Sequence, residues 1–208
     1  MSKRQSNREE IFTRILDAAE VEFGLKGFNG ASLQHIADRA ELPKPNIVYY
    51  FQSKENLYKQ VLNKIVRSWN DLFDRATVED DPAQVLDSFI RIKLKQSFEQ
   101  GRSSRIFAME VISGANHIRD YLKEELSPWF HSRTAVIQAW IDSGKMRSVD
   151  PTSLIFMTWA TTQHYADFEA QILALSHKEA QDEEDLKRVG DTVSSIILQG
   201  VGLSLPQS

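Results

Sequence analysis

The sequence predicts an all-α fold of about nine helices, and three observations support this. Apolar residues recur at the three- and four-residue spacing of a buried helix face along nearly the whole chain. No segment shows the sustained alternation of apolar and polar residues that is typical of a half-buried strand. Glycine, proline, serine and aspartate interrupt the helical pattern where helices would begin or end.

The N-terminal quarter of the chain predicts three helices and the start of a fourth. The expected ranges are 8–25, 33–40, 43–51 and 54–76. A glycine-rich turn ends the first helix, Ser32 caps the second, and prolines in the first turn open the third. Two short helices joined by about four residues and packed on a longer one predict a helix-turn-helix. The second helix of such a pair is the one that enters a major groove.

The rest of the chain predicts a helical body that is continuous with the fourth helix. The expected ranges are 82–99, 105–113, 117–142 with a break near Pro128, 150–175 and 183–203. The pattern contains no internal repeat and no low-complexity linker. We therefore expect two domains that share a long helix, an N-terminal head at 1–55 and a body at 56–208.

Composition limits the possible classes of protein. Of the 208 residues, 41% are hydrophobic and 26% are charged, which is typical of a soluble globular chain. There is no apolar run of about 18 residues, and the polar N-terminus is unlike a signal peptide, so a cytoplasmic location is expected. The absence of cysteine excludes disulfides and thiolate zinc sites. The net charge of −4 argues against a broad basic surface, but not against a small basic patch.

The head resembles a known family. The residues that carry the resemblance are Phe23-Gly24, Gly27-Phe28, Gly30, Ser32, Ile36-Ala37, Tyr49-Tyr50-Phe51, Lys54-Glu55 and Leu57-Tyr58. Over about residues 11–62 this pattern resembles the N-terminal signature of TetR-family transcriptional regulators. The resemblance implies a DNA-binding head, a ligand-binding and dimerisation body, and no enzymatic activity or cofactor.

The third helix divides into two kinds of position. The apolar residues of the helix pair are expected to lock it onto the first helix: Ile36, Ala37, Ile47, Val48 and Phe51. From the sequence alone, the polar residues form either a solvated face or a DNA-reading face. The second is possible because lysine and tyrosine side chains reach phosphates, and an asparagine early in the helix reaches base edges. The resemblance favours DNA contact by Ser32, Lys44, Pro45, Asn46, Tyr49, Tyr50 and Lys54.

Pro43 departs from the family pattern, which usually has a small hydroxyl residue at this position. Proline neither caps the third helix through its side chain nor donates a hydrogen bond to a phosphate. The sequence leaves open whether the recognition helix therefore begins one residue later.

Segments 91–94, 104–110 and 155–168 of the body resemble the branch of the family that regulates pyrimidine utilisation and senses uracil. Trp159 and Gln163 lie four residues apart on one helix face, and glutamine both donates and accepts hydrogen bonds, as a planar amide ligand requires. Pairs with the same spacing occur on two earlier helices. The expected effector-binding residues are Trp69, Phe73, Lys93, Ser97, Trp159 and Gln163. The alternative is core packing for the aromatic residues and a surface ion pair for Lys93.

His164 and Asp167, with His117, His131 or His177, are candidates for a metal site or an acid–base pair. Their three-residue spacing on one helix is common by chance, and no third ligand is placed beside them. We therefore expect no metal and no catalytic residues. The acidic run 179–185 is expected to be a solvated loop and helix start.

The resulting hypothesis is a homodimeric, ligand-responsive repressor. Two-fold symmetry would place two recognition helices in successive major grooves of a palindromic operator, about 34–36 Å apart. The last two helices are expected to form the dimer seam through Phe156, Ala160, Ile172, Val193, Ile197 and Val201. Three alternatives remain: a regulator of an unrelated aromatic or hydrophobic effector, a ligand-independent architectural DNA binder, and a small-molecule-binding or hydrolytic helical protein that does not bind DNA.

Overall fold

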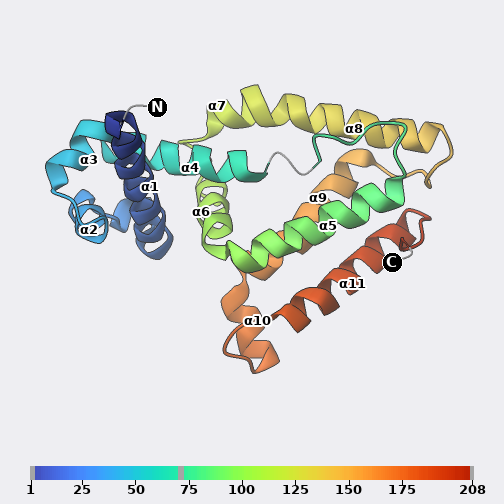
Figure 1. Cartoon of the computed structure of the whole chain (residues 1–208). Coiled ribbons are helices and arrows are strands. Elements are labelled where there is room, and N and C mark those ends of the chain that lie inside the picture. The colour runs from blue at the N-terminus through green and yellow to red at the C-terminus, as the bar shows by residue number, and fades with distance from the viewer. Residues whose placement is uncertain (1–2, 70–72, 207–208) are drawn as a thin grey trace. The chain divides into compact units, whose positions relative to one another are not determined.

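The computed structural model describes residues 3–69 and 73–206, and every regular element in these ranges is a helix (Figure 1). The all-α prediction is confirmed. The elements are α1 Lys3–Gly30, α2 Leu33–Arg39, α3 Lys44–Phe51, α4 Lys54–Trp69, α5 Pro82–Glu99, α6 Gly101–Ile112, α7 Arg119–Tyr121, a π-helical turn Leu122–Leu126, α8 Ser127–Asp142, α9 Pro151–Asp167, α10 Glu169–Ser176 and α11 Glu183–Gly200.

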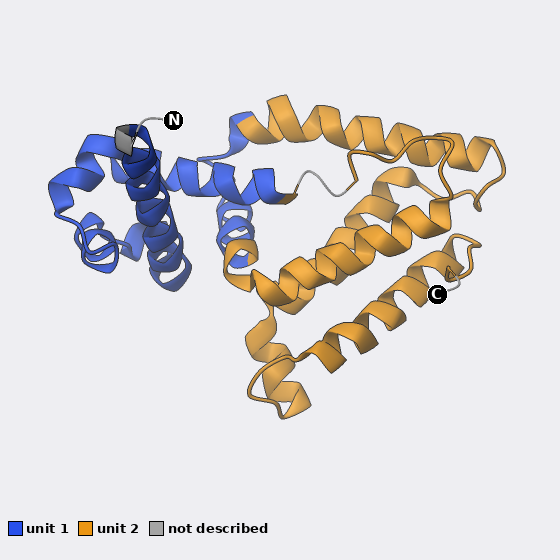
Figure 2. Cartoon of the chain, viewed as in Figure 1, with its two compact units in different colours: residues 1–68, 105–120 blue, residues 69–104, 121–208 orange. Residues whose placement is uncertain are grey.

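The chain forms two compact units (Figure 2). Unit 1 contains Met1–Ser68 and Arg105–Asp120, and unit 2 contains Trp69–Ser104 and Tyr121–Ser208. Unit 1 therefore includes most of α4 and α6 as well as the helix-turn-helix. The expected boundary between a DNA-binding domain, 1–55, and a ligand-binding domain, 56–208, stays a prediction.

Unit 1 is built around α1. Residues with apolar side chains at helical spacing on α1, among them Ile15, Ala19 and Phe23, are fully buried. The helix is interrupted at Gly27, whose φ of 65° is in the left-handed region that glycine adopts without strain. Ser32 then caps α2, because its Oγ accepts a hydrogen bond from the His35 amide at 3.1 Å.

The helix pair is held on α1 by most of the expected core residues. Ile36, Ala37, Ile47 and Phe51 are all at least 99% buried, and the Phe51 ring stacks on Phe12 of α1 at 4.8 Å between centroids. The assignment of Val48 to this core was wrong, because its side chain is 44% exposed. On a helix of only eight residues, the buried stripe is too narrow to include both Ile47 and its neighbour.

A second cluster in unit 1 joins α4 and α6. The Glu110 carboxylate is buried and accepts hydrogen bonds from the amide and ring Nδ1 of His117, at 2.7 and 3.1 Å. The Tyr58 ring lies 5.1 Å from the His117 ring and 4.8 Å from Phe23. Burial, together with Glu110, raises the pKa of the Tyr58 phenol. An aromatic and hydrogen-bonded cluster thus holds α4 against the segment that follows α6 in unit 1.

Unit 2 packs α5, α8, α9 and α11 around one apolar core. Asp81 and Asp150 cap α5 and α9, and Asp182 forms a capping box with Asp185 at the start of α11. In Figure 1, α5 and α11 run side by side. The core between these helices includes Ile90, Leu94 and Trp140, each of which is fully buried.

Several helix boundaries differ from the expected ones. The range 150–175 is two helices, because α9 ends at Asp167 and Phe168, with φ −114° and ψ 26°, separates it from α10. Pro128 does not break the segment before α8, since it lies in the first turn of α8, where its missing N–H is tolerated. The expected extension of the fourth helix to residue 76 falls partly on 70–72, outside the described residues, and 73–75 form a turn.

Part of the expected dimer seam was wrong. Val193, Ile197 and Val201 are 3–9% exposed and belong to the core of their own unit. On α9 and α11, the large exposed apolar side chains are Phe156 (52%), Met157 (51%) and Ile196 (67%). Of the other residues expected in the seam, Ala160 on α9 is exposed and Ile172 on α10 is half-buried. Apolar residues occur on two faces of α11, and periodicity alone does not show which of them faces the core.

In the described part of the chain, no helix is both long and apolar enough to cross a membrane. The same residues contain no group of three or more histidine or acidic side chains arranged to hold a metal ion.

Candidate nucleic-acid interface and effector pocket

The third helix, α3, begins at Lys44. Pro43 is its N-cap residue and provides no side-chain hydrogen bond, while Pro45 lies in the first turn. The Asn46 amide donates to the Pro43 carbonyl oxygen at 2.9 Å. Because Pro45 has no N–H and the Asn46 amide is already bonded, the first turn of α3 offers few amides to another acceptor.

The outward face of α3 carries most of the expected DNA-contacting residues. Lys44, Pro45 and Tyr49 are exposed, and Tyr49 is the most exposed aromatic residue of the helix at 73%. Tyr50 is half-buried, with its ring 6.5 Å from Phe12 and 5.3 Å from Tyr49. Asn46 is also half-buried. These residues share one short helix, so together they form a continuous surface of suitable size for a groove.

Val48 adds an apolar side chain to this surface, and sequence reasoning missed it because it was assigned to the core. An exposed valine beside Tyr49 is suited to contact with a thymine methyl group. The signal that identifies it is the short length of α3, which leaves few positions for burial.

Ser32 and Lys54 have roles within the fold. The Ser32 Oγ caps α2, as described above. The Lys54 ammonium donates to the Ala31 carbonyl at 3.1 Å and lies 4.7 Å from the Phe28 ring centroid. Both residues thus brace the turn before α2, and their contact with phosphate stays a prediction.

In unit 2, four of the six expected effector-binding residues line one cavity. They are Trp69 of α4, Lys93 and Ser97 of α5, and Gln163 of α9. Gln96, Gln100 and Ser104 complete the lining. The cavity volume is about 10 Å³, which is room for one water molecule. A larger ligand would enter only if these side chains moved apart.

Lys93 has an unusual environment for a lysine. Its side chain is 6% exposed, and its Nζ lies 4.9 Å from the centroid of the Trp69 ring. Among the residues that the structure describes, no oxygen accepts a hydrogen bond from this ammonium. Burial lowers the pKa of Lys93 to about 8, against the attraction of Asp167. The alternative of a surface ion pair for Lys93 is therefore excluded.

Ser104 was not recognised as a pocket residue from the sequence. It is 4% exposed, and its Oγ donates a hydrogen bond to Oδ1 of Asp167 at 2.6 Å. Asp167 was considered only as a possible metal ligand with His164, whereas the His164 ring stacks on Phe168 at 4.8 Å. The sequence feature that would have indicated a role for Asp167 beside the cavity is its four-residue spacing from Gln163, which puts both on one face of α9.

The structure does not bring Phe73 and Trp159 to this cavity. Phe73 is 1% exposed in the core and stacks on Phe89 at 5.0 Å. Trp159 packs on Trp129 at 6.1 Å and on Phe130 at 5.8 Å. Both aromatic side chains therefore pack in or against the core, which is the alternative to effector binding given above.

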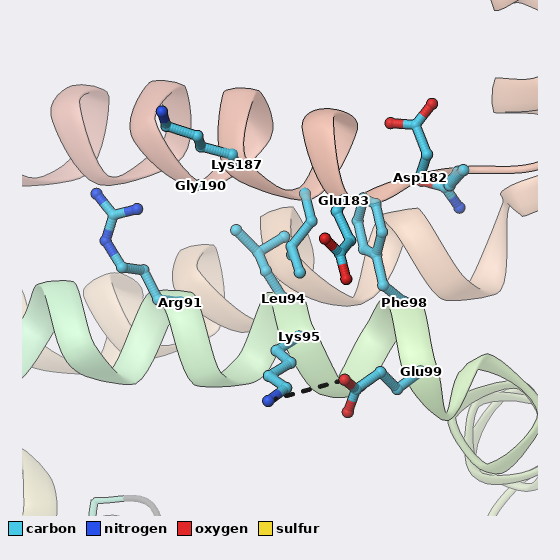
Figure 3. A pocket seen from close by; sticks show the side chains of 11 residues that line it. Arg91, Leu94, Lys95, Phe98, Glu99, Asp182, Glu183, Lys187 and Gly190 are labelled. Atoms are coloured by element: carbon cyan, nitrogen blue, oxygen red, sulfur yellow. Dashed lines mark ion pairs between the residues drawn. The ribbon is translucent and has the colours of Figure 1, made fainter.

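Unit 2 also has a larger groove, between α5 and the start of α11 (Figure 3). Its volume is about 690 Å³. Leu94, Phe98 and Leu186 contribute apolar surface, and charged side chains such as Lys95 and Glu99, an ion pair at 3.8 Å, line its edges.

Comparison with protein families assigns both parts of the chain. Residues 15–61 match the family described as bacterial regulatory proteins, tetR family. Residues 62–204 match the family described as YcdC-like protein, C-terminal region.

Two curated relatives and two solved structures illustrate the similarity. The chain is 38% identical over 187 residues to the HTH-type transcriptional regulator RutR of Escherichia coli K12, covering 90% of this chain and 88% of that protein. It is 26% identical to the HTH-type transcriptional repressor NicS of Pseudomonas putida KT2440, over 70% of this chain and 68% of that protein.

The solved structures show the same fold at low identity. The putative regulator SCO4942 of Streptomyces coelicolor has a TM-score of 0.73 at 19% identity, covering 98% of this chain and all of that one. AibR, in complex with isovaleryl coenzyme A and operator DNA, has a TM-score of 0.67 at 18% identity, covering 89% of this chain and 97% of that one.

Proposed function

The chain belongs to the TetR family of bacterial regulatory proteins, and we propose that it is a repressor released from its operator by a small planar pyrimidine, uracil or a close relative. The family resemblance found in the sequence is confirmed. Members of this family are ligand-responsive transcriptional regulators that act as dimers. The curated relatives are regulators as well, which supports a function other than catalysis.

The observation that carries the proposed effector is the convergence of Trp69, Lys93, Ser97 and Gln163 on one cavity. These residues come from three helices that are distant in sequence, and each supplies a function that a planar amide ligand needs. Trp69 offers a flat apolar face, while the other three offer donors and acceptors at its edge. The cavity itself has room for one water molecule, so a ligand of one ring needs a smaller separation of the lining side chains than a larger ligand does.

The same cavity suggests how binding is transmitted. Trp69 is the last described residue of α4, and Ser104 lies in the first turn of α6. Both helices continue into residues that belong to unit 1. A ligand that separates Trp69 from its neighbours would favour one conformation of these helices over another, and the shift is limited by its differential affinity for the two.

DNA contact is assigned to α3, on the support of its exposed Lys44 and Tyr49. A homodimer through α9 and α11 would present two such helices to a palindromic site. The exposed Phe156, Met157 and Ile196 supply apolar surface for that seam.

A second candidate effector is favoured by the groove between α5 and α11. Its volume of about 690 Å³ and its apolar floor with charged edges suit a larger amphipathic molecule. This alternative keeps the regulatory function and changes only the ligand.

A gel-shift experiment with the DNA upstream of the chain's own gene tests the proposal. We expect a retarded complex that millimolar uracil releases, and a Gln163→Leu variant that still binds DNA without responding to uracil. Retardation that no pyrimidine affects would remove this effector and favour the larger ligand or an architectural role. Failure to bind any upstream fragment would favour the helical small-molecule-binding protein.

A further inference from the structure

On one side of the effector cavity, the Ser104 hydroxyl already donates its proton to a carboxylate. Ser104 lines the cavity and is 4% exposed, and its Oγ lies 2.6 Å from Oδ1 of Asp167. An ionised carboxylate only accepts hydrogen bonds, so the single hydroxyl proton lies between the two oxygens. The lone pairs of Ser104 Oγ are left to accept a hydrogen bond from whatever occupies the cavity.

Another part of the lining holds a buried ammonium. Lys93 has three N–H donors and no acceptor capacity; its Nζ lies 4.9 Å from the centroid of the Trp69 ring, and the charge of Asp167 attracts it. A buried ammonium without hydrogen bonds is unfavourable, which agrees with its lowered pKa of about 8. A ligand oxygen in the cavity would supply the missing acceptor.

We propose that Ser104 and Lys93 together recognise the lactam edge of the effector, with Ser104 accepting from its ring N–H and Lys93 donating to the adjacent C=O. Asp167 is the positioning residue, because it fixes Ser104 as an acceptor. The inference rests on the proposed function and adds to it a chemical class: cyclic amides with an unsubstituted N–H beside a carbonyl.

The lactam edge explains why both groups are present. An acceptor alone would bind any N–H, and an ammonium alone would bind any anion or carbonyl. A ligand whose ring nitrogens are methylated supplies no donor to the buried lone pairs of Ser104 Oγ, and a site built to bond a polar group discriminates strongly against a ligand that lacks it.

Calorimetry on the full-length protein tests this with four compounds. Uracil presents the edge, 1,3-dimethyluracil lacks both N–H groups, and 5,6-dimethyluracil keeps them at the same size. The fourth compound, 2-pyridone, retains a single lactam and little else. We expect the wild type to bind uracil, 5,6-dimethyluracil and 2-pyridone at least about tenfold more tightly than 1,3-dimethyluracil.

Ser104→Ala should weaken uracil and 2-pyridone by about five- to 100-fold and leave 1,3-dimethyluracil unchanged, so that the preference disappears. Asp167→Asn should reduce the same preference while Ser104 is present. Ser103→Ala is the matched control, because Ser103 is 7% exposed on the same helix and is not part of the cavity lining. Operator binding by each variant shows that it is folded.

The outcomes separate the inference from the proposed function. A wild-type preference that survives in Ser104→Ala overturns the inference and leaves uracil as the effector. Binding of 2-pyridone that depends on Ser104, without binding of uracil, supports the inference and removes uracil. If neither lactam binds, or if 1,3-dimethyluracil binds as tightly as uracil, the inference is wrong whatever releases the operator.

Discussion

Replacing Lys93 with methionine should make the protein more stable and at the same time unresponsive to its effector. The lysine is 6% exposed, and its ammonium is buried over the Trp69 ring. Methionine has a similar length and fills the same space without a charge. The substitution therefore removes an unfavourable buried cation while the packing of α5 is retained.

The size of the effect follows from the pKa of Lys93. Its ordinary value of 10.5 falls to about 8 in the folded protein, and at about 1.4 kcal/mol per pH unit the gap amounts to about 3 kcal/mol. Below pH 8 the lysine is protonated in both states, and the whole penalty lowers the stability of the wild type. Between pH 8 and 10.5 the unfolded chain holds more protons than the folded one, so the stability of the wild type rises with pH.

The assay is chemical denaturation at pH 7 and at pH 10, at one fixed protein concentration because a dimer's stability depends on it. We expect Lys93→Met to raise the free energy of unfolding at pH 7 by about 2–3 kcal/mol, and to lose most of this advantage at pH 10. Lys95→Met is the control, because Lys95 is on the same helix with a side chain 62% exposed; its effect should stay within about 0.5 kcal/mol. A Lys93→Met variant less stable than the wild type at pH 7, with an unchanged pH dependence, would refute the reasoning.

Three further predictions concern the interfaces. Lys44→Ala and Tyr50→Phe should weaken operator binding in fluorescence anisotropy without lowering the melting temperature, and Lys44→Ala should reduce the slope of log affinity against log salt by about one contact per subunit; full affinity in both would exclude α3 as the reading helix. Ile196→Asp should shift the dimer toward monomer in light scattering because Ile196 is 67% exposed, whereas Ile197→Asp should unfold the protein because Ile197 is 3% exposed in the core; the reverse result would move the seam elsewhere. Gln163→Leu should weaken the calorimetric binding free energy of uracil by about 1–3 kcal/mol and leave operator affinity unchanged. Uracil binding as tight as in the wild type would remove Gln163 from the site.

The helix-turn-helix was predictable from the sequence because its determinants are local. Helical periodicity, the Ser32 cap and the glycine at residue 27 each act over a few residues, and the structure uses them as expected. The sequence left the start of α3 open at Pro43, and the structure places it at Lys44, with Pro43 as the N-cap residue.

The lining of the cavity was only partly predictable, since a pocket depends on contacts between helices. The four-residue spacing of Trp159 and Gln163 correctly places both on α9, but that spacing does not show which neighbour each of them meets. Gln163 lines the cavity, while Trp159 packs on Trp129. The pairing of Ser104 with Asp167 joins residues 63 positions apart, and no local pattern contains that information.

The sequence alone was therefore enough to establish the family resemblance and the all-α fold, because helix periodicity, capping and motif spacing are properties of neighbouring residues; the DNA-reading helix and the effector site stay predictions. The tertiary structure was needed to show which apolar face of α11 is core, which aromatic residues line the cavity, and that Lys93 is buried over the Trp69 ring. Each of these depends on how helices distant in sequence pack together, and packing sets burial, solvation and hydrogen-bond partners.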